Sequence, residues 1–253
     1  SIATVTGCWQ YEGGGAFHSN GGIFKLDKTL VEGTRLADPR IRSLDQLQLP
    51  KIVETLAKES RGLILVTGTT GSGKSTTLAS MIDLLNQTEA LHMITVEDPI
   101  EYLHEDKQSI ISQREVGVDV TSFAAGLKGA LRQDPDVILV GEMRDLETIE
   151  TAIMSAETGH LVMSTLHTLD APETVTRVIQ AFPDHQREQI RVVLSSVLKG
   201  IISQRLVPRA DGNGLVPAVE IMVSTGLVRD IIKDPERSPR EITDALAKGH
   251  VSY

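Results

Sequence analysis

The stretch that decides the fold is Arg61–Thr77, which reads RGLILVTGTTGSGKSTT. It begins with an apolar run, Leu63–Val66, typical of a strand that is buried on both faces. The following residues, Gly68–Ser75, match the phosphate-loop pattern G-x-x-x-x-G-K-[ST] at every fixed position. Because the loop follows a predicted strand and opens a predicted helix, Lys74–Gln87, we interpret it as a nucleotide-binding loop and not as a ligand-free glycine-rich turn.

Each residue type in this loop has an expected role. Glycines let successive backbone N–H groups turn toward a polyphosphate, and the helix N-terminus adds positive potential. We expect Lys74 to reach the β- and γ-phosphates and the Ser75 hydroxyl to ligate Mg²⁺. The nucleotide-binding residues predicted here are Gly68, Thr69, Thr70, Gly71, Ser72, Gly73, Lys74, Ser75 and Thr76.

Beyond the loop, predicted strands and helices alternate along the chain. The strands are expected at Met93–Val96, Val137–Val140 and Leu161–Thr165, and the helices at Ser122–Arg132, at Asp145–Glu157, from Asp170, and from Asp184 to about Gly200. This alternation predicts an α/β fold whose mainly parallel sheet has helices on both faces. The turn signal Asp211–Gly214 predicts an antiparallel hairpin between Arg205–Val207 and Val216–Met222.

Two groups of acidic residues are predicted to lie at the carboxyl edge of this sheet. Glu142 follows the strand Val137–Val140, so we interpret it as the base that positions water and as a metal ligand, and the alternative is a helix cap. Gly141 occupies the position where a phosphate-loop protein usually carries an aspartate. The second group is Glu97, Asp98 and Glu101, with Glu97 and Asp98 expected at the nucleotide and Glu101 in catalysis. Here the alternative is a solvated acidic loop.

Two histidines frame the predicted strand Leu161–Thr165: His160 precedes it and His167 follows it. A histidine can sense a γ-phosphate or connect a nucleotide to a neighbouring subunit through its two ring nitrogens. We therefore expect His160 to contact the nucleotide and His167 to act in catalysis, whereas each alone would more often be a packed or capping residue.

The chain of 253 residues divides into three expected segments. Residues 1–42 are glycine-rich and are expected to be a fragment of a domain whose start is missing. Residues 43–60 are expected to form a linker with short helices, since Ser43 and Gln46 make a capping pattern and Pro50 suits a first helical turn. Residues 61–253 are expected to form the nucleotide-binding domain.

The amino-acid composition narrows the classes of protein to which this chain can belong. The 25 basic and 34 acidic residues give a net charge of −9, and only 3% of residues are aromatic, which argues against a nucleic-acid-binding protein. A single cysteine, Cys8, excludes an intramolecular disulfide and an all-cysteine zinc site. No apolar run approaches 18 residues and no secretion leader opens the chain, so a cytosolic protein is expected.

Taken together, the motifs resemble those of the secretion-type ATPases, which drive type II secretion and type IV pili. The matching segments are Arg61–Thr77, Ile94–Glu101 (ITVEDPIE), Gln113–Gly117 (QREVG), Asp134–Asp145 (DPDVILVGEMRD) and Ala156–Thr168 (AETGHLVMSTLHT). They correspond to the family's Walker A, Asp box, Walker B and His box elements, and a glycine at the position of Gly141 is usual there. Within the family, the chain most resembles the pilus retraction ATPases.

The resemblance implies a RecA-like, Mg²⁺-dependent ATPase domain preceded by a PAS-like N-terminal domain, of which residues 1–42 would be a truncated remnant. It implies a homohexameric ring that binds ATP between subunits, with Arg35, Arg114 and Arg132 as candidates to act across the interface. It also implies a cytoplasmic protein, peripheral at the inner membrane, whose partner is the pilus platform protein. Family chains continue past this C-terminus, so further helices are expected to be missing.

Three other interpretations stay open. A pilus-assembly or secretion ATPase would carry a four-cysteine zinc module after the His box, and no cysteine follows Cys8, which favours retraction. A RecA-like helicase or DNA translocase shares the loop and the sheet but would need more positive charge. A regulator that binds the nucleotide without hydrolysing it would not need Glu142.

Overall fold

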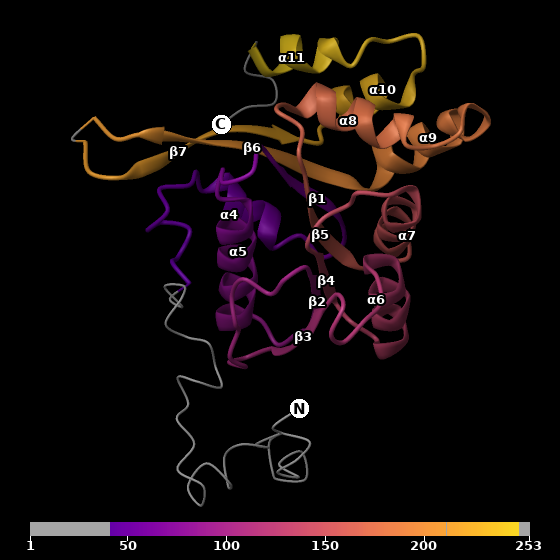
Figure 1. Cartoon of the computed structure of the whole chain (residues 1–253). Coiled ribbons are helices and arrows are strands. Elements are labelled where there is room, and N and C mark those ends of the chain that lie inside the picture. The colour runs from indigo at the N-terminus through magenta and orange to yellow at the C-terminus, as the bar shows by residue number, and fades with distance from the viewer. Residues whose placement is uncertain (1–40, 211, 248–253) are drawn as a thin grey trace, which may run out of the picture. The chain divides into compact units, whose positions relative to one another are not determined.

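The computed structural model describes residues 41–210 and 212–247 (Figure 1). The expected PAS-like remnant lies outside this part except for residues 41 and 42, and so does Arg35. The helices are α4 (Ile52–Ala57), α5 (Lys74–Thr88), α6 (Phe123–Ala130), α7 (Leu146–Glu157), α8 (Ala171–Gln180), α9 (Arg187–Val197), α10 (Gly226–Lys233) and α11 (Arg240–Ala247), with short 3-10 turns at Leu131–Gln133 and Asp184–Gln186. None of these helices is long and apolar enough to cross a membrane.

One seven-stranded sheet organises the domain (Figure 1). Its strands are β1 (Gly62–Thr67), β2 (His92–Glu97), β3 (Ile110–Glu115), β4 (Val137–Val140), β5 (Leu161–Leu166), β6 (Leu198–Pro208) and β7 (Leu215–Val223). The spatial order is β3-β2-β4-β5-β1-β6-β7, and every neighbouring pair is parallel except the antiparallel pair β6 and β7. The predicted α/β fold with a mainly parallel sheet is therefore confirmed.

Helices cover both faces of the sheet, and β1 shows why its sequence is apolar without alternation. Leu63 and Leu65 point into the core beneath α6, α7, α8 and α9, whereas Ile64 and Val66 point into the core beneath α4 and α5. All four side chains are at most 1% exposed. Burial of both faces requires apolar residues at every position of the strand, as in other parallel sheets.

Residues 43–60 pack onto the domain as part of its core. The backbone N–H of Ser43 donates to Gln46 Oε1 and that of Gln46 to Ser43 Oγ, so the predicted capping pattern forms. Only a turn follows it, because Gln48 has a φ of 57°. Leu44, Leu49 and α4 then bury apolar side chains against α5.

The helix predicted from Asp184 to about Gly200 is wrong at its end. Helix α9 stops at Val197, and β6 begins at Leu198 without an intervening loop. Gly200 lies inside β6, where an added Cβ would come within 2.8 Å of Leu56 Cδ1. Strand β6 therefore starts earlier than the predicted hairpin, and its first half pairs with β1 in parallel. Strand β3 was not predicted.

Candidate active site

The phosphate loop leaves the carboxyl end of β1 and enters α5. Gly68 has a φ of 142°, and a Cβ there would lie 2.3 Å from the carbonyl oxygen of Gln204 on β6. Gly73 precedes the first residue of α5 with a φ of 89°. Both positions therefore require glycine, as the motif predicted. Thr77 on α5 donates to Gln204 Oε1 at 2.8 Å, which holds the helix against β6.

Lys74 folds back over the loop in this structure. Its Nζ donates to the carbonyl oxygens of Gly68 at 2.9 Å and Thr69 at 3.0 Å. The residue is 8% exposed. Burial lowers the pKa of Lys74, and the carboxylates of Glu142 and Glu101 act in the opposite direction. The loop therefore holds a cation where phosphates would enter, close to two acidic side chains.

A cleft of about 510 Å³ opens in front of this loop. Its lining comes from the carboxyl ends of β1, β2, β4 and β5 and from the start of α5. The predicted site residues that line it are Thr70, Gly71, Gly73, Lys74, Ser75, Thr76, Glu97, Asp98, Glu101, Glu142 and His167. Gly68, Thr69 and Ser72 belong to the same loop, and the Ser72 hydroxyl is buried without a hydrogen-bond partner. The structure thus gathers the loop, both acidic groups and one of the two predicted histidines in one cavity.

Glu142 lies at the end of β4 and is held on both carboxylate oxygens. Oε2 is 2.8 Å from Arg144 Nη2, and Oε1 is 3.0 Å from His167 Nε2. The preceding Gly141 approaches β2 so closely that a Cβ would be 3.3 Å from the Glu97 Cα. An aspartate at this position would therefore push its Cβ against the β2 backbone, which is a packing reason for glycine.

The acidic residues after β2 differ in environment. Glu97 accepts hydrogen bonds from Thr95 Oγ1 at 2.6 Å and Gln113 Nε2 at 3.3 Å. Burial raises the pKa of Glu97, although these two hydrogen bonds lower it. Asp98 and Glu101 are exposed where they line the cleft. Glu97 is thus the least exposed member of the group, and the other two are accessible to a bound cation.

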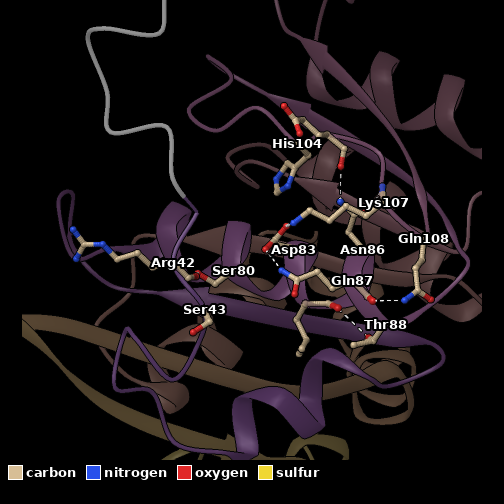
Figure 2. Close-up of polar contacts among 12 residues, drawn as sticks. Arg42, Ser43, Ser80, Asp83, Asn86, Gln87, Thr88, His104, Lys107 and Gln108 are labelled. Carbon is tan, nitrogen blue, oxygen red and sulfur yellow. Dashed lines mark hydrogen bonds and ion pairs between the residues drawn. The ribbon is translucent and has the colours of Figure 1, made fainter. Parts of the chain in front are cut away.

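The loop between β2 and β3, residues 98–109, is fastened to α5 (Figure 2). The Asn86 side chain is fully buried; its Nδ2 donates to the Glu105 carbonyl at 2.7 Å, and its Oδ1 accepts from the Lys107 backbone N–H at 3.0 Å. Lys107 also forms an ion pair with Asp83. Because α5 begins at the phosphate loop, these contacts fix Asp98 and Glu101 relative to the phosphate-binding residues.

Two further side chains of this loop line the cleft. The Tyr102 hydroxyl is 2.8 Å from Thr76 Oγ1, one residue past Ser75. The His104 imidazole lies against α5, and its Nδ1 is buried without a hydrogen-bond partner (Figure 2). Burial lowers the pKa of His104 to about 4; Asp83 opposes this shift and Lys107 adds to it. His104 is therefore neutral near pH 7.

This buried imidazole predicts acid sensitivity. Well above pH 6.5 the folded and unfolded chains both hold His104 neutral, so it contributes nothing to the pH dependence there. As the pH falls from 6.5 to about 4, the unfolded chain gains a proton that the folded chain excludes. His104→Gln should therefore remove an acid destabilisation of up to about 3 kcal/mol. Urea unfolding at several pH values measures how the free energy of unfolding depends on pH. His185→Gln, at an exposed histidine, is the matched control. Identical slopes for wild type and His104→Gln would contradict the prediction.

The structure does not bring every predicted residue to the cleft. His160 lies at the amino end of β5, where its backbone carbonyl accepts from Gly62 N and its Nδ1 is 2.9 Å from the Ser155 carbonyl. Arg114 lies on β3, with Nη1 near Gly129 of α6, and Arg132 is exposed in the turn after α6. None of the three lines the cleft.

Several cleft residues were not predicted: Arg144, Thr165, Tyr102 and His104. Thr165 Oγ1 donates to the Gly141 carbonyl at 2.7 Å and so joins β5 to the residue before Glu142. Arg144 is two residues from Glu142, so proximity in sequence was the one signal that pointed to it. Tyr102 and His104 depend on the path of residues 98–109, for which the sequence has no periodic pattern.

Fold and cleft define a phosphate-loop protein of the α/β class, with its acidic groups at the carboxyl edge of a mainly parallel sheet. The family model described as "Type II/IV secretion system protein" matches residues 40–229. The chain belongs to this family.

Individual relatives agree with this assignment. The chain is 49% identical over 212 residues to a twitching motility protein of Neisseria gonorrhoeae, covering 84% of this chain and 56% of that protein. It is 45% identical to the type IV pilus retraction ATPase PilT of Pseudomonas aeruginosa, covering 87% and 61%. A crystal structure of the pilus retraction motor PilT with bound ADP matches with a TM-score of 0.78 at 52% identity, covering 83% of this chain and 60% of that one. The chain thus spans about three fifths of the length of these relatives.

Proposed function

We propose that this chain is the catalytic part of a RecA-like ATPase that powers retraction of a type IV pilus. The observation that carries the proposal is the single cleft in which Lys74 of the phosphate loop, Glu142 and the acidic residues after β2 face one another. Phosphate binding, water activation and cation binding need these three groups together. Relatives named for twitching motility and for pilus retraction support retraction as the direction of the motor.

Each group has a proposed role in ATP hydrolysis. The loop amides and Lys74 bind the phosphates, and Glu142 accepts the proton of the attacking water. His167, in contact with Glu142, orients this carboxylate, and Glu101 adds a second carboxylate on the open side of the cleft. The ATP-binding set also includes the predicted Glu97 and Asp98. His160 is left out because it lies at the amino end of β5, whereas the cleft lies at the carboxyl ends of the strands.

The cleft also fits Mg²⁺. In the described ranges, no three His, Cys, Asp or Glu side chains are arranged to hold a metal by themselves. Mg²⁺ bound with a nucleotide needs only one or two protein oxygens beside the phosphates. Ser75 offers a hydroxyl at the first turn of α5, and Glu142 offers a carboxylate in the same cleft. When bound, the ion neutralises charge on the phosphates.

We further propose that the motor is a homohexameric ring in which a neighbouring subunit completes the site. Within residues 41–210 and 212–247, Lys74 and Arg144 are the lysine and arginine side chains that line the cleft, and four carboxylates line it with them. Additional cations would stabilise the transition state. Arg35, Arg114 and Arg132 remain the candidates.

The full-length protein is therefore expected to form a ring during turnover. Light scattering should give a mass near six subunits in the presence of ATP. An arginine-to-alanine variant at position 114 should lower turnover while leaving nucleotide binding by the isolated chain intact. A full-length protein that hydrolyses ATP at its full rate as a monomer would contradict the shared site.

The direction of the motor is tested in the host. Deleting the gene should leave surface pili present or more abundant and should abolish twitching motility. Electron microscopy and a surface-spreading assay measure the two effects. A mutant without pili would instead identify an assembly motor, and complementation with the intact gene is the control.

The cell location and the partner follow from the same proposal. The motor would act at the cytoplasmic face of the inner membrane, on the pilus platform protein. Assembly and secretion motors are the alternative, disfavoured by the absence of a second cysteine from the sequence and hence of a four-cysteine zinc module. A DNA translocase is disfavoured by the net charge of −9, and ATPase stimulation by single-stranded DNA would revive it.

A further inference from the structure

Arg144 forms an ion pair with Glu142, the carboxylate that the proposed reaction needs as its base. Its Nη2 is 2.8 Å from Glu142 Oε2, while the other oxygen of Glu142 faces His167. A general base must lie within hydrogen-bond reach of the water that it deprotonates. Here both carboxylate oxygens face cationic or polar side chains. Each carboxylate oxygen has two lone pairs, so Arg144 takes one of the acceptor sites on Oε2 that a water molecule could use.

Of these partners, Arg144 is the one placed to move. Its side chain is 65% exposed, whereas that of Glu142 is 16% exposed. It lies in the short loop after β4, and it lines the same cleft as Lys74 and Ser75. Because the guanidinium is exposed, water screens its side of the ion pair and competes for its N–H groups. Arginine–phosphate pairs, by contrast, are commonly bidentate and charge-assisted.

We infer that Arg144 distinguishes ATP from ADP in this cleft by exchanging its partner. Without a γ-phosphate, the guanidinium donates to Glu142; with one, it donates to a γ-phosphate oxygen and leaves Glu142 Oε2 open to water. One arginine–carboxylate pair is replaced by one arginine–phosphate pair, and no covalent bond changes. The inference rests on the proposed function and adds to it a residue that links γ-phosphate binding to release of the base.

The first test compares two nucleotides. Affinities for ADP and for the non-hydrolysable imido analogue of ATP are measured by calorimetry with Mg²⁺ on the 253-residue chain. Arg144→Ala should weaken analogue binding about tenfold or more, the size of one charge-assisted hydrogen bond, and leave ADP binding within about twofold. Arg144→Lys should fall between. Arg177→Ala, on the exposed side of α8, is the matched control and should change neither affinity.

The second test asks whether Glu142 and the γ-phosphate compete for Arg144. Glu142→Gln weakens the ion pair, so it should tighten analogue binding about tenfold when Arg144 is present. Removing a negative charge from the cleft would by itself tighten binding in any background. The gain in analogue affinity that Glu142→Gln produces in the Arg144→Ala background measures that general effect. We expect this gain to be no more than about threefold.

The outcomes separate the inference from the proposed function. Equal weakening of ADP and analogue binding by Arg144→Ala would overturn the inference, because it indicates a structural role. An equal gain from Glu142→Gln with and without Arg144 would overturn it as well, since no exchange would then be required. In both cases the nucleotide site itself would stand. A wild-type chain that binds neither nucleotide would overturn the proposed function and the inference with it.

Discussion

Replacing Lys74 with alanine is expected to abolish nucleotide binding, weakening it by at least about a hundredfold. The Lys74 ammonium already lies inside the loop, bonded to the carbonyls of Gly68 and Thr69. In the proposed complex it leaves these carbonyls for the β- and γ-phosphates, at a site where it is 8% exposed and poorly screened. Without it, the phosphates would face Glu142 and Glu101 with no lysine between them.

A titration with a fluorescent ATP analogue measures this effect, and thermal unfolding by circular dichroism shows whether the variant is folded. Lys58→Ala is the matched control, because Lys58 is an exposed lysine just after α4 that pairs with Glu54 and does not line the cleft. Binding by a folded Lys74→Ala variant within threefold of wild type would show that the loop is not the phosphate site.

The sequence predicts the centre of this domain well because two independent constraints coincide there. The loop glycines must have positive φ or approach β6 closely, and the strands on either side must be apolar on both faces. Strand β4 therefore matches its predicted bounds, Val137–Val140, and β1 and β2 extend theirs by one residue at each end. Glu142 could be predicted because it comes just after the carboxyl end of β4, where ligands bind in such sheets.

Other features depend on contacts that no local pattern records. His160 and His167 flank the same strand, yet a six-residue strand spans about 20 Å, so only the residue at its carboxyl end reaches the cleft. Strand β3 carries Ser112, Gln113 and Arg114 and lies at the sheet edge, where a continuous apolar run is not required. The burial of Asn86, which fastens residues 98–109, likewise appears only in three dimensions.

Glu142→Gln should retain nucleotide binding and lose turnover by about 10²- to 10⁴-fold, the usual contribution of a general base. The substitution keeps the shape and the hydrogen-bond acceptor of the side chain but removes the group that takes the proton. Phosphate release in the full-length protein measures turnover, and exposed Glu150→Gln on α7 is the matched control.

Glu101 is the competitor for this role, because it is a second carboxylate in the same cleft. The two differ in how they are held: Glu142 is 16% exposed and bonded to His167, whereas Glu101 is an exposed residue of the loop after β2. A base must hold one position while water attacks, which favours Glu142. Glu101→Gln should therefore lower turnover less than Glu142→Gln does. Wild-type-like turnover in Glu142→Gln, together with an inactive Glu101→Gln, would move the base to the loop after β2.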